Sequence, residues 1–339
     1  MPKVSVILPV HNGMPYLPEA VQSIQAQSSR DWELVLIDDG SQDESASYIE
    51  ALVDDRIRIH TNPARMGLAA SLNMGFALAS GEYIARMDAD DVAEPQRLDR
   101  QIRYFENHPE IAICGTWART FGGRKDQEWR YPERDADIKA EMLFASVIVH
   151  SSAMFRRSAI AELGMRYDES LEAAQDYALW VEYQDQVRFA NVPEFLMRYR
   201  IHTEQVGERI GARQQEVAEQ VREKQLADLG IDANSIEKAL HHRIARWDFD
   251  DSVSSLKPIE VWLLRIVNAN TASSYFDAGA LGQAVELRWW NACRRLASKE
   301  KGAWDRYLRS KIAKLGSRTQ VEKRVFAAKS ALYSFGMRQ

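Results

Sequence analysis

Five aspartates follow two apolar segments of the sequence. They are Asp38 and Asp39 after segment 33–37, and Asp88, Asp90 and Asp91 after segment 82–87. Carboxylates that converge on one edge of a sheet repel each other unless a cation lies between them. In Asp88-Ala89-Asp90 the spacing of two places both side chains on the same side of an extended chain. Hard oxygens presented in this way suit Mg²⁺ or Mn²⁺ carrying a phosphorylated ligand, so we predict a metal site here.

Aspartates after strands can also form turns or cap helices, because the carboxylate accepts hydrogen bonds from nearby backbone N–H groups. For Asp43 and Asp91 we favour this simpler interpretation. It does not account for two acidic clusters that follow separate strands.

The sequence contains neither a GxGxxG motif after the first apolar segment nor a GxxxxGK[ST] motif. A dinucleotide-dependent oxidoreductase or a P-loop nucleotidase would need such a loop to bind phosphate through backbone amides. Phosphate must then be neutralised by a metal ion and by side chains. The candidates are Arg65, Arg86 and the run Arg198-Tyr199-Arg200. Arg86 stands two residues before Asp88, so a salt bridge to the acidic edge is an equal alternative for it.

Alternating strands and helices must position these residues. The segments that we expect to be strands are 4–10, 33–37, 56–60 and 82–87. Between them apolar residues recur at helical spacing, as in Leu17, Val21 and Ile24, and Ser41 with Glu44 predicts a capping box. Alternating β and α units predict an α/β fold with a mainly parallel sheet, helices on both faces, and ligands at the carboxyl ends of the strands.

The pattern is less regular after residue 97, with further strands expected near 111–117, 154–155 and 195–199 and helices from 97 and over 176–186. Beyond Gly211 the chain is predicted to be helical. A length near twice that of a typical domain agrees with two parts, which we place at residues 1–210 and 211–339.

The composition is that of a globular protein, with 45% hydrophobic and 27% charged residues among 339. It excludes a disordered, collagen-like or repeat protein. Cys114 and Cys293 are too few for a disulfide framework or a thiolate metal site, which favours a reducing cytoplasm. The longest segment without Asp, Glu, Lys or Arg, 66–81, has 16 residues, whereas a membrane span needs about 20. The apolar run 4–10 is also too short for a signal peptide.

The net charge of -5 is unevenly distributed, because residues 288–339 hold 14 basic and 3 acidic residues. Three tryptophans and two tyrosines lie among them: Trp289, Trp290, Trp304, Tyr307 and Tyr333. Such a segment suits an anionic membrane surface, or is simply a solvated helical surface. We expect no nucleic acid partner.

Seven ordered motifs carry a resemblance to a known family. They are 4–12 (VSVILPVHN), 34–41 (LVLIDDGS), 67–75 (GLAASLNMG), 81–91 (GEYIARMDADD), 150–156 (HSSAMFR), 175–180 (QDYALW) and 199–202 (YRIH). Together they resemble the family 2 glycosyltransferases of the GT-A fold, in particular a bacterial subgroup. The resemblance spans residues 3–207, and residues 208–339 resemble no family that we can name.

The resemblance implies a nucleotide-sugar donor, a divalent metal and an inverting displacement. Pro9 and His11 would line the base pocket, Asp39 would accept a hydrogen bond from the base N3–H, and Asp88 would meet the ribose. Arg65, Asn73 and Arg86 complete the expected donor-binding residues.

The same resemblance makes Asp90 a metal ligand and Asp176 the general base, while His202 would approach the diphosphate or the metal. An inverting transfer needs a base on the side opposite the leaving group, so one acid separate from the cluster is chemically reasonable. Without the resemblance, Asp176 is interpreted as a helix N-cap and His202 as a surface residue or a core residue with satisfied hydrogen bonds. Trp180, one turn beyond Asp176, is either a sugar-stacking or a core residue.

Two positions depart from the family pattern. His11 stands where the family usually has Tyr, which bears on the choice of nucleobase. Gln175 stands where it usually has Glu, and losing this neighbouring charge should lower the pKa of Asp176 slightly.

From these features we expect a metal-dependent inverting glycosyltransferase that uses a nucleoside-diphosphate sugar, UDP first. The acceptor would be a saccharide or a lipid-linked molecule of bacterial surface polymers. We expect a cytoplasmic location, with residues 288–339 as a candidate contact to the inner membrane face. The alternatives are a metal-dependent nucleotidyltransferase and a catalytically silent subunit that binds nucleotide sugars.

Overall fold

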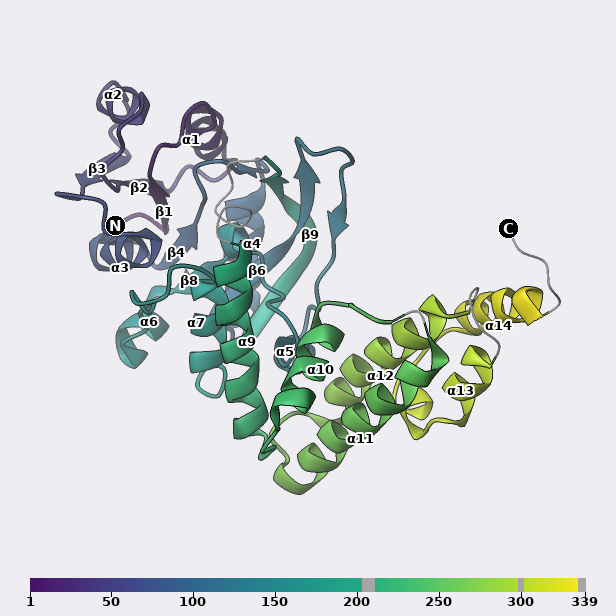
Figure 1. Ribbon diagram of the computed structural model, residues 1–339. Helices are drawn as coiled ribbons and strands as arrows, with labels where there is room; N and C mark the ends of the chain where they lie inside the picture. Colours follow the sequence, from purple (N-terminus) through teal and green to yellow (C-terminus); the bar gives the residue numbers. More distant parts are fainter. Residues whose placement is uncertain (203–210, 251, 298–301, 335–339) are drawn as a thin grey trace. The chain divides into compact units, whose positions relative to one another are not determined.

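The computed structural model describes residues 1–202, 211–250, 252–297 and 302–334 (Figure 1). The chain forms two compact units. The first comprises residues 1–138 and 146–218, and the second comprises residues 139–145 and 219–339.

The first unit begins with four parallel strands in the order β3-β2-β1-β4. The strands are β1 (Val4–Val10), β2 (Trp32–Asp38), β3 (Ile57–Thr61) and β4 (Tyr83–Arg86). The helices between them are α1 (Leu17–Gln25), α2 (Ser45–Glu50) and α3 (Leu68–Leu78). The predicted alternation of strands and helices is therefore confirmed over this segment.

The sheet continues beyond β4 in the order β8-β6-β9-β5, and β7 pairs with β6. These strands are β5 (Val92–Ala93), β6 (Ile113–Phe121), β7 (Glu128–Trp129), β8 (Met154–Arg156) and β9 (Phe189–Arg200). The long β6–β9 ladder is parallel, whereas the short strands β5, β7 and β8 pair antiparallel. The sheet is mixed in this half because β8 runs against both of its neighbours. The helices here are α4 (Arg97–Asn107), α5 (Asp135–Met142), α6 (Arg157–Leu163) and α7 (Gln175–Tyr183).

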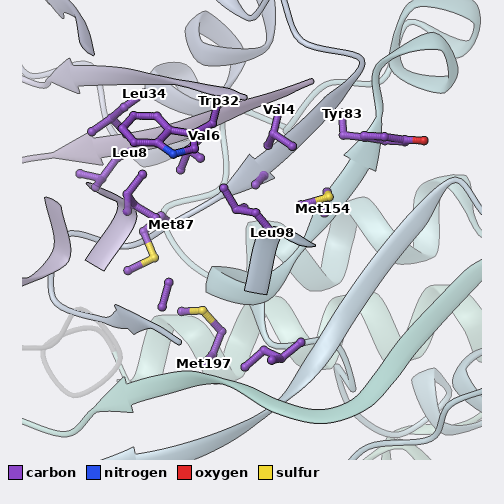
Figure 2. Close-up of a cluster of buried hydrophobic side chains, with 14 of the residues drawn as sticks. Val4, Val6, Leu8, Trp32, Leu34, Tyr83, Met87, Leu98, Met154 and Met197 are labelled. Atoms are coloured by element: carbon purple, nitrogen blue, oxygen red, sulfur yellow. The ribbon is translucent and has the colours of Figure 1, made fainter. Parts of the chain in front are cut away.

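Helices cover both faces of the parallel strands. Alternate residues of β1, such as Val6 and Leu8, share a core with Leu17 and Val21 of α1, and Figure 2 shows part of this cluster. The residues between them face α3, because a Cβ added at Gly75 would lie 2.3 Å from Ile7 Cγ2. Glycine at this position therefore lets α3 approach the sheet closely.

The predicted capping box at the start of α2 is wrong. The Ser41 hydroxyl accepts from the backbone N–H of Asn12, and Asp43 accepts from the backbone N–H of Ser45 instead. The simpler interpretation of Asp43 as a turn or cap residue is correct.

The second unit is helical. Its helices are the C-terminal part of α9 (Gly211–Asp228), then α10 (Ser235–Ala245), α11 (Leu256–Ser273), α12 (Ala278–Arg295), α13 (Ala303–Arg309) and α14 (Gln320–Ser334). Trp289, Trp290 and Tyr307 are buried in its core. These three rings are therefore not available to a membrane surface, contrary to one interpretation of their basic surroundings. Within the described ranges, every helix is too short or too polar to span a bilayer.

Segment 139–145 belongs to this second unit, although it lies within the sequence of the first. The buried Arg288 guanidinium pairs with Glu141 at 2.6 Å. The carbonyl oxygens of Met142 and Leu143 accept from Gln225 and His241 at 2.6 and 3.0 Å. Nothing in the local sequence pattern indicated this arrangement, because these contacts join residues about a hundred positions apart.

Candidate active site

The acidic clusters predicted from the sequence lie at the ends of β2 and β4. Asp88, Asp90 and Asp91 each offer a carboxylate oxygen within 4.8 Å of the others. Asp91 is 1% exposed, and its Oδ2 has no hydrogen-bond partner among the residues that the structure describes. Burial, together with the charges of Asp88 and Asp90, raises the pKa of Asp91 well above its ordinary value. Hard oxygens gathered in this way fit a divalent cation.

Asp39 organises the loop that precedes α3. Its carboxylate accepts from the Asn62 side chain and from the backbone N–H groups of Met66 and Gly67, at 2.7, 2.7 and 2.8 Å. Burial opposes ionisation, but these hydrogen bonds outweigh it and lower the pKa of Asp39. A fixed, ionised acceptor thus lies beside the end of β1.

The loops after β1 and β2 are joined by hydrogen bonds. His11 Nδ1 lies 2.9 Å from the carbonyl oxygen of Asp39, and Asn12 Oδ1 accepts from the backbone N–H of Gln42. Pro9 is buried in β1. It lies beyond the residues of β1 that pair with β4, so its missing backbone N–H is not needed for a hydrogen bond to that strand.

Arg65 is exposed in the loop that Asp39 organises. The loop passes close to Gly40, which has φ +69°, and a Cβ there would lie 3.1 Å from the Arg65 backbone nitrogen. Glycine is therefore required at position 40 for both its conformation and this close approach.

Arg86, the last residue of β4, contacts the acidic cluster. Its side chain is 2% exposed and forms an ion pair with Asp88. Of the two interpretations that the sequence left open for Arg86, the structure contains the salt bridge. Burial and the charges of Asp90 and Asp176 raise the pKa of Asp88 to about 6, although Arg86 opposes this shift.

A second buried arginine, Arg97 of α4, supports the same strand end and was missed in the sequence. Its guanidinium donates to the Arg86 carbonyl oxygen at 2.7 Å and to Gln101 Oε1 at 3.1 Å. Gln101 in turn donates to the carbonyl oxygens of Cys114 and Ser152, both at 2.9 Å. The available signal was a polar pair at i, i+4 beside the apolar stripe of Leu98 and Ile102.

The end of β9 contacts the acidic cluster. His202 Nε2 lies 3.0 Å from Asp90 Oδ2, and the His202 ring lies 4.6 Å from the ring of Tyr16. Arg200 donates through Nε to the Asp90 carbonyl oxygen and through its backbone N–H to Asp91 Oδ1, at 2.7 and 2.9 Å. The structure thus brings together the two residues predicted as metal ligands. The simpler interpretation of Asp91 as a turn or cap residue is wrong, because its carboxylate accepts from a backbone N–H that lies 109 positions away in the sequence.

Asp176 lies in the first turn of α7. The N-cap of α7 is Ala174, and no side chain caps the helix, so Asp176 is not the N-cap residue. Its Oδ2 accepts from the Ser146 hydroxyl at 3.4 Å. Burial raises the pKa of Asp176, and its charge contributes to the raised pKa of Asp88. The fold therefore brings this distant acid within electrostatic reach of the cluster, whereas Trp180 is fully buried and is a core residue.

Asn73 of α3 is occupied by contacts within the protein. Its amide donates to the Tyr167 carbonyl oxygen and accepts from the Tyr167 backbone N–H, at 3.0 and 2.8 Å. The Tyr167 hydroxyl lies 2.9 Å from His150 Nε2. Asn73 therefore fixes the chain segment that carries the buried Tyr167 ring.

Comparison with known proteins identifies the family. The description "Glycosyl transferase family 2" matches residues 5–164. An uncharacterized glycosyltransferase of Haemophilus influenzae is 30% identical over 251 residues, which cover 69% of this chain and 78% of that protein. The chain belongs to glycosyl transferase family 2.

Solved structures share the fold of this family 2 protein. S. aureus TarS 1-349 in complex with UDP-GlcNAc has a TM-score of 0.57 at 16% identity and covers 99% of this chain and 92% of its own. The mannosyltransferase PcManGT from Pyrobaculum calidifontis, in complex with GDP-Man and Mn2+, has a TM-score of 0.53 at 19% identity. The match covers 99% of this chain and 88% of the PcManGT chain. The predicted GT-A fold is confirmed.

Proposed function

We propose that this protein is a metal-dependent, inverting glycosyltransferase that moves a hexose or an N-acetylhexosamine from a UDP-sugar to a saccharide or lipid-linked acceptor. The observation that carries the proposal is the cluster of three closely spaced carboxylates, Asp88, Asp90 and Asp91, with His202 beside Asp90. An inverting transfer requires a general base on the acceptor side and a metal ion at the leaving group. The separate acid Asp176 would supply the base, and the acidic cluster would hold the metal ion.

Asp90 and Asp91 would hold Mg²⁺ or Mn²⁺, with His202 beside Asp90 as a further ligand. The unpartnered Oδ2 of Asp91 and the three closely spaced carboxylates support this assignment. When bound, the ion supplies positive charge that stabilises the diphosphate leaving group.

The donor would bind at the ends of β1 and β2. His11 presents a ring beside Asp39, whose carboxylate would accept a hydrogen bond from the base N3–H. Asp88 would meet the ribose, and the exposed Arg65 would reach the phosphates as a donor-binding residue. The TarS complex with UDP-GlcNAc supports UDP as the nucleotide, whereas the PcManGT complex contains GDP-Man.

Asp176 would be the general base. It would take the proton of the acceptor hydroxyl while that oxygen forms a bond to the anomeric carbon. The bond from this carbon to the diphosphate oxygen breaks, and its electron pair leaves with the nucleoside diphosphate. The Ser146 hydroxyl, 3.4 Å from Asp176, would orient the carboxylate. The raised pKa of Asp176 makes it a better proton acceptor than an ordinary aspartate.

We also propose that the segment 288–339 contacts an anionic membrane surface. Its exposed side chains include Arg294, Arg309, Lys311, Lys314 and Arg324. Because the aromatic residues Trp289, Trp290 and Tyr307 are buried, this contact would rest on the basic side chains and not on these three rings.

The function is tested by donor hydrolysis and transfer assays with Mn²⁺. The wild-type protein should release UDP slowly from a UDP-sugar, whereas a silent subunit would bind the donor without releasing UDP. A nucleotidyltransferase would instead release pyrophosphate from a nucleoside triphosphate. Asp176→Asn should abolish transfer with donor affinity nearly unchanged, because the base acts on the acceptor. A large loss of donor binding in this variant would contradict the role of Asp176.

A further inference from the structure

One face of the β7-β6-β9 region carries alternating arginines and aromatic rings. The β6–β9 register pairs Arg119 with Arg198 and Phe121 with Arg200. The preceding residues Ala118 and Met197 belong to the buried core, and the intervening Tyr199 packs against it. Because successive side chains of a strand point to opposite faces, the paired arginines and Phe121 share the face that does not enter this core.

The guanidinium groups on this face stack on aromatic rings. Arg119 lies over Phe195 at 4.2 Å, and Arg130 lies over the same ring at 5.2 Å. Arg198 and Arg200 lie over Phe121, at 4.4 and 4.3 Å. Stacking on a ring reduces the freedom of a guanidinium group and leaves its edge N–H groups able to bind an anion. We call these six residues the arginine face: Arg119, Phe121, Arg130, Phe195, Arg198 and Arg200.

The charge of the arginine face is opposite to that of the surrounding unit. Residues 1–210 hold 22 basic and 34 acidic residues. On the arginine face, Glu128 pairs with both Arg119 and Arg130, and Glu19 pairs with Arg200. In the described part of the chain, no carboxylate forms a salt bridge with Arg198. The side chains of Arg119 and Arg130 are 52% and 59% exposed, so solvent and ligands reach this face.

The arginine face is continuous with the candidate active site. Its last member, Arg200, donates to the Asp90 carbonyl oxygen, and its backbone N–H donates to Asp91 Oδ1. A chain molecule that lies along β9 would therefore reach the acidic cluster at the end of the strand. Half-buried rings suit the apolar faces of sugars, and forked guanidinium groups suit phosphate or carboxylate.

We propose that the arginine face binds the acceptor, and that the acceptor is an anionic saccharide whose phosphate or carboxylate groups pair with these arginines. The proposal rests on the transferase function proposed above and names the chemical class of its acceptor. The anion bound by Arg119 and Arg130 would not be the donor diphosphate. These two arginines lie at the hairpin formed by β6 and β7, whereas the donor is expected at the ends of β2 and β4.

The test compares the wild-type full-length chain with Arg119→Gln/Arg130→Gln and with the control Arg103→Gln. Arg103 is an exposed arginine of α4 that also pairs with a carboxylate, Asp99. The probes are a phosphomannan, oligogalacturonate, neutral dextran and single-stranded DNA. Affinity is measured by calorimetry at fixed ionic strength, and circular dichroism verifies that each variant is folded.

We expect the wild type and Arg103→Gln to bind one or both anionic saccharides and not dextran, and the double variant to bind about ten-fold more weakly. The phosphate and carboxylate probes identify the acceptor's anionic group. Equal binding by the double variant, no binding of either anionic saccharide, or equally tight binding of DNA would overturn the proposal. Donor hydrolysis by the wild type is measured separately, so failure of the transferase function is distinguished from failure of this binding face.

Discussion

The ion pair beneath the acidic cluster allows two neighbouring substitutions to be compared. Arg86 is 2% exposed and pairs with Asp88, and its Nε has no hydrogen-bond partner in the described ranges. Asp90, two residues after Asp88, contacts His202. His202 depends less on a counter-ion than Arg86 does, because histidine can be neutral. Asp88→Asn therefore leaves a buried charge without its contacting counter-ion, whereas Asp90→Asn does not.

The expected difference follows from burial. Breaking a buried ion pair by removing one partner costs about 3–5 kcal/mol. Because Asp88 is 27% exposed and two other carboxylates remain nearby, we take the lower end, about 3 kcal/mol. For a unit of this size that corresponds to a fall of roughly 6–12 °C in the unfolding midpoint. Asp90→Asn should stay within about 1 kcal/mol of the wild type, because it also relieves repulsion within the cluster.

The measurement is thermal and urea unfolding of both variants, followed by circular dichroism with EDTA present so that metal binding does not contribute. Isothermal titration with Mn²⁺ should then show weakened metal binding in Asp90→Asn despite its normal stability. Equal unfolding midpoints for the two variants would refute the argument, since Arg86 would then not depend on Asp88.

Two further predictions concern the elements that hold the site. Gly75→Ala should destabilise the first unit by about 1–3 kcal/mol, because the new Cβ would lie 2.3 Å from Ile7 Cγ2; urea unfolding checks this, and wild-type stability would mean that α3 can move away from the sheet. Asp39→Asn should cost about 1–3 kcal/mol at pH 7, because an amide N–H would face the backbone donors of the loop. The pKa of Asp39 is lowered on folding, so the ionised Asp39 adds to the free energy of unfolding above its unfolded-state pKa. This contribution is lost as the pH falls through the folded-state pKa. The difference in the free energy of unfolding between Asp39→Asn and the wild type should therefore shrink towards pH 3. A difference that stays constant with pH would contradict this role of Asp39.

Local sequence was sufficient for β1 to β4 and for the acidic rim, but it did not predict β5, β7 or the first half of β9. The mainly apolar run that became β1 and the aspartates after β2 and β4 depend only on neighbouring residues. In a parallel sheet, strand ends meet at one edge, so the alternation of strands and helices was enough to group their side chains. The capping box at Ser41 failed because the serine contacts Asn12, which belongs to another loop.

Other features depend on contacts that local sequence patterns do not specify. Arg97 has the sequence environment of an ordinary helix residue, yet it is buried and holds the carbonyl oxygen of Arg86. Trp289 and Trp290, among basic residues, fitted a membrane surface as well as a core, and they are in the core. Periodicity indicates which face of an element is apolar, but not which element covers it.

The alternating elements, the acidic motif and the family resemblance follow from the amino-acid sequence, because each of these is carried by residues close together in the chain. Three relations follow only from the packed fold: His202 lies beside Asp90, the charge of Asp176 acts on Asp88, and segment 139–145 packs within the helical unit. These relations join residues many tens of positions apart, and they form only when the packing of the whole core brings the elements together.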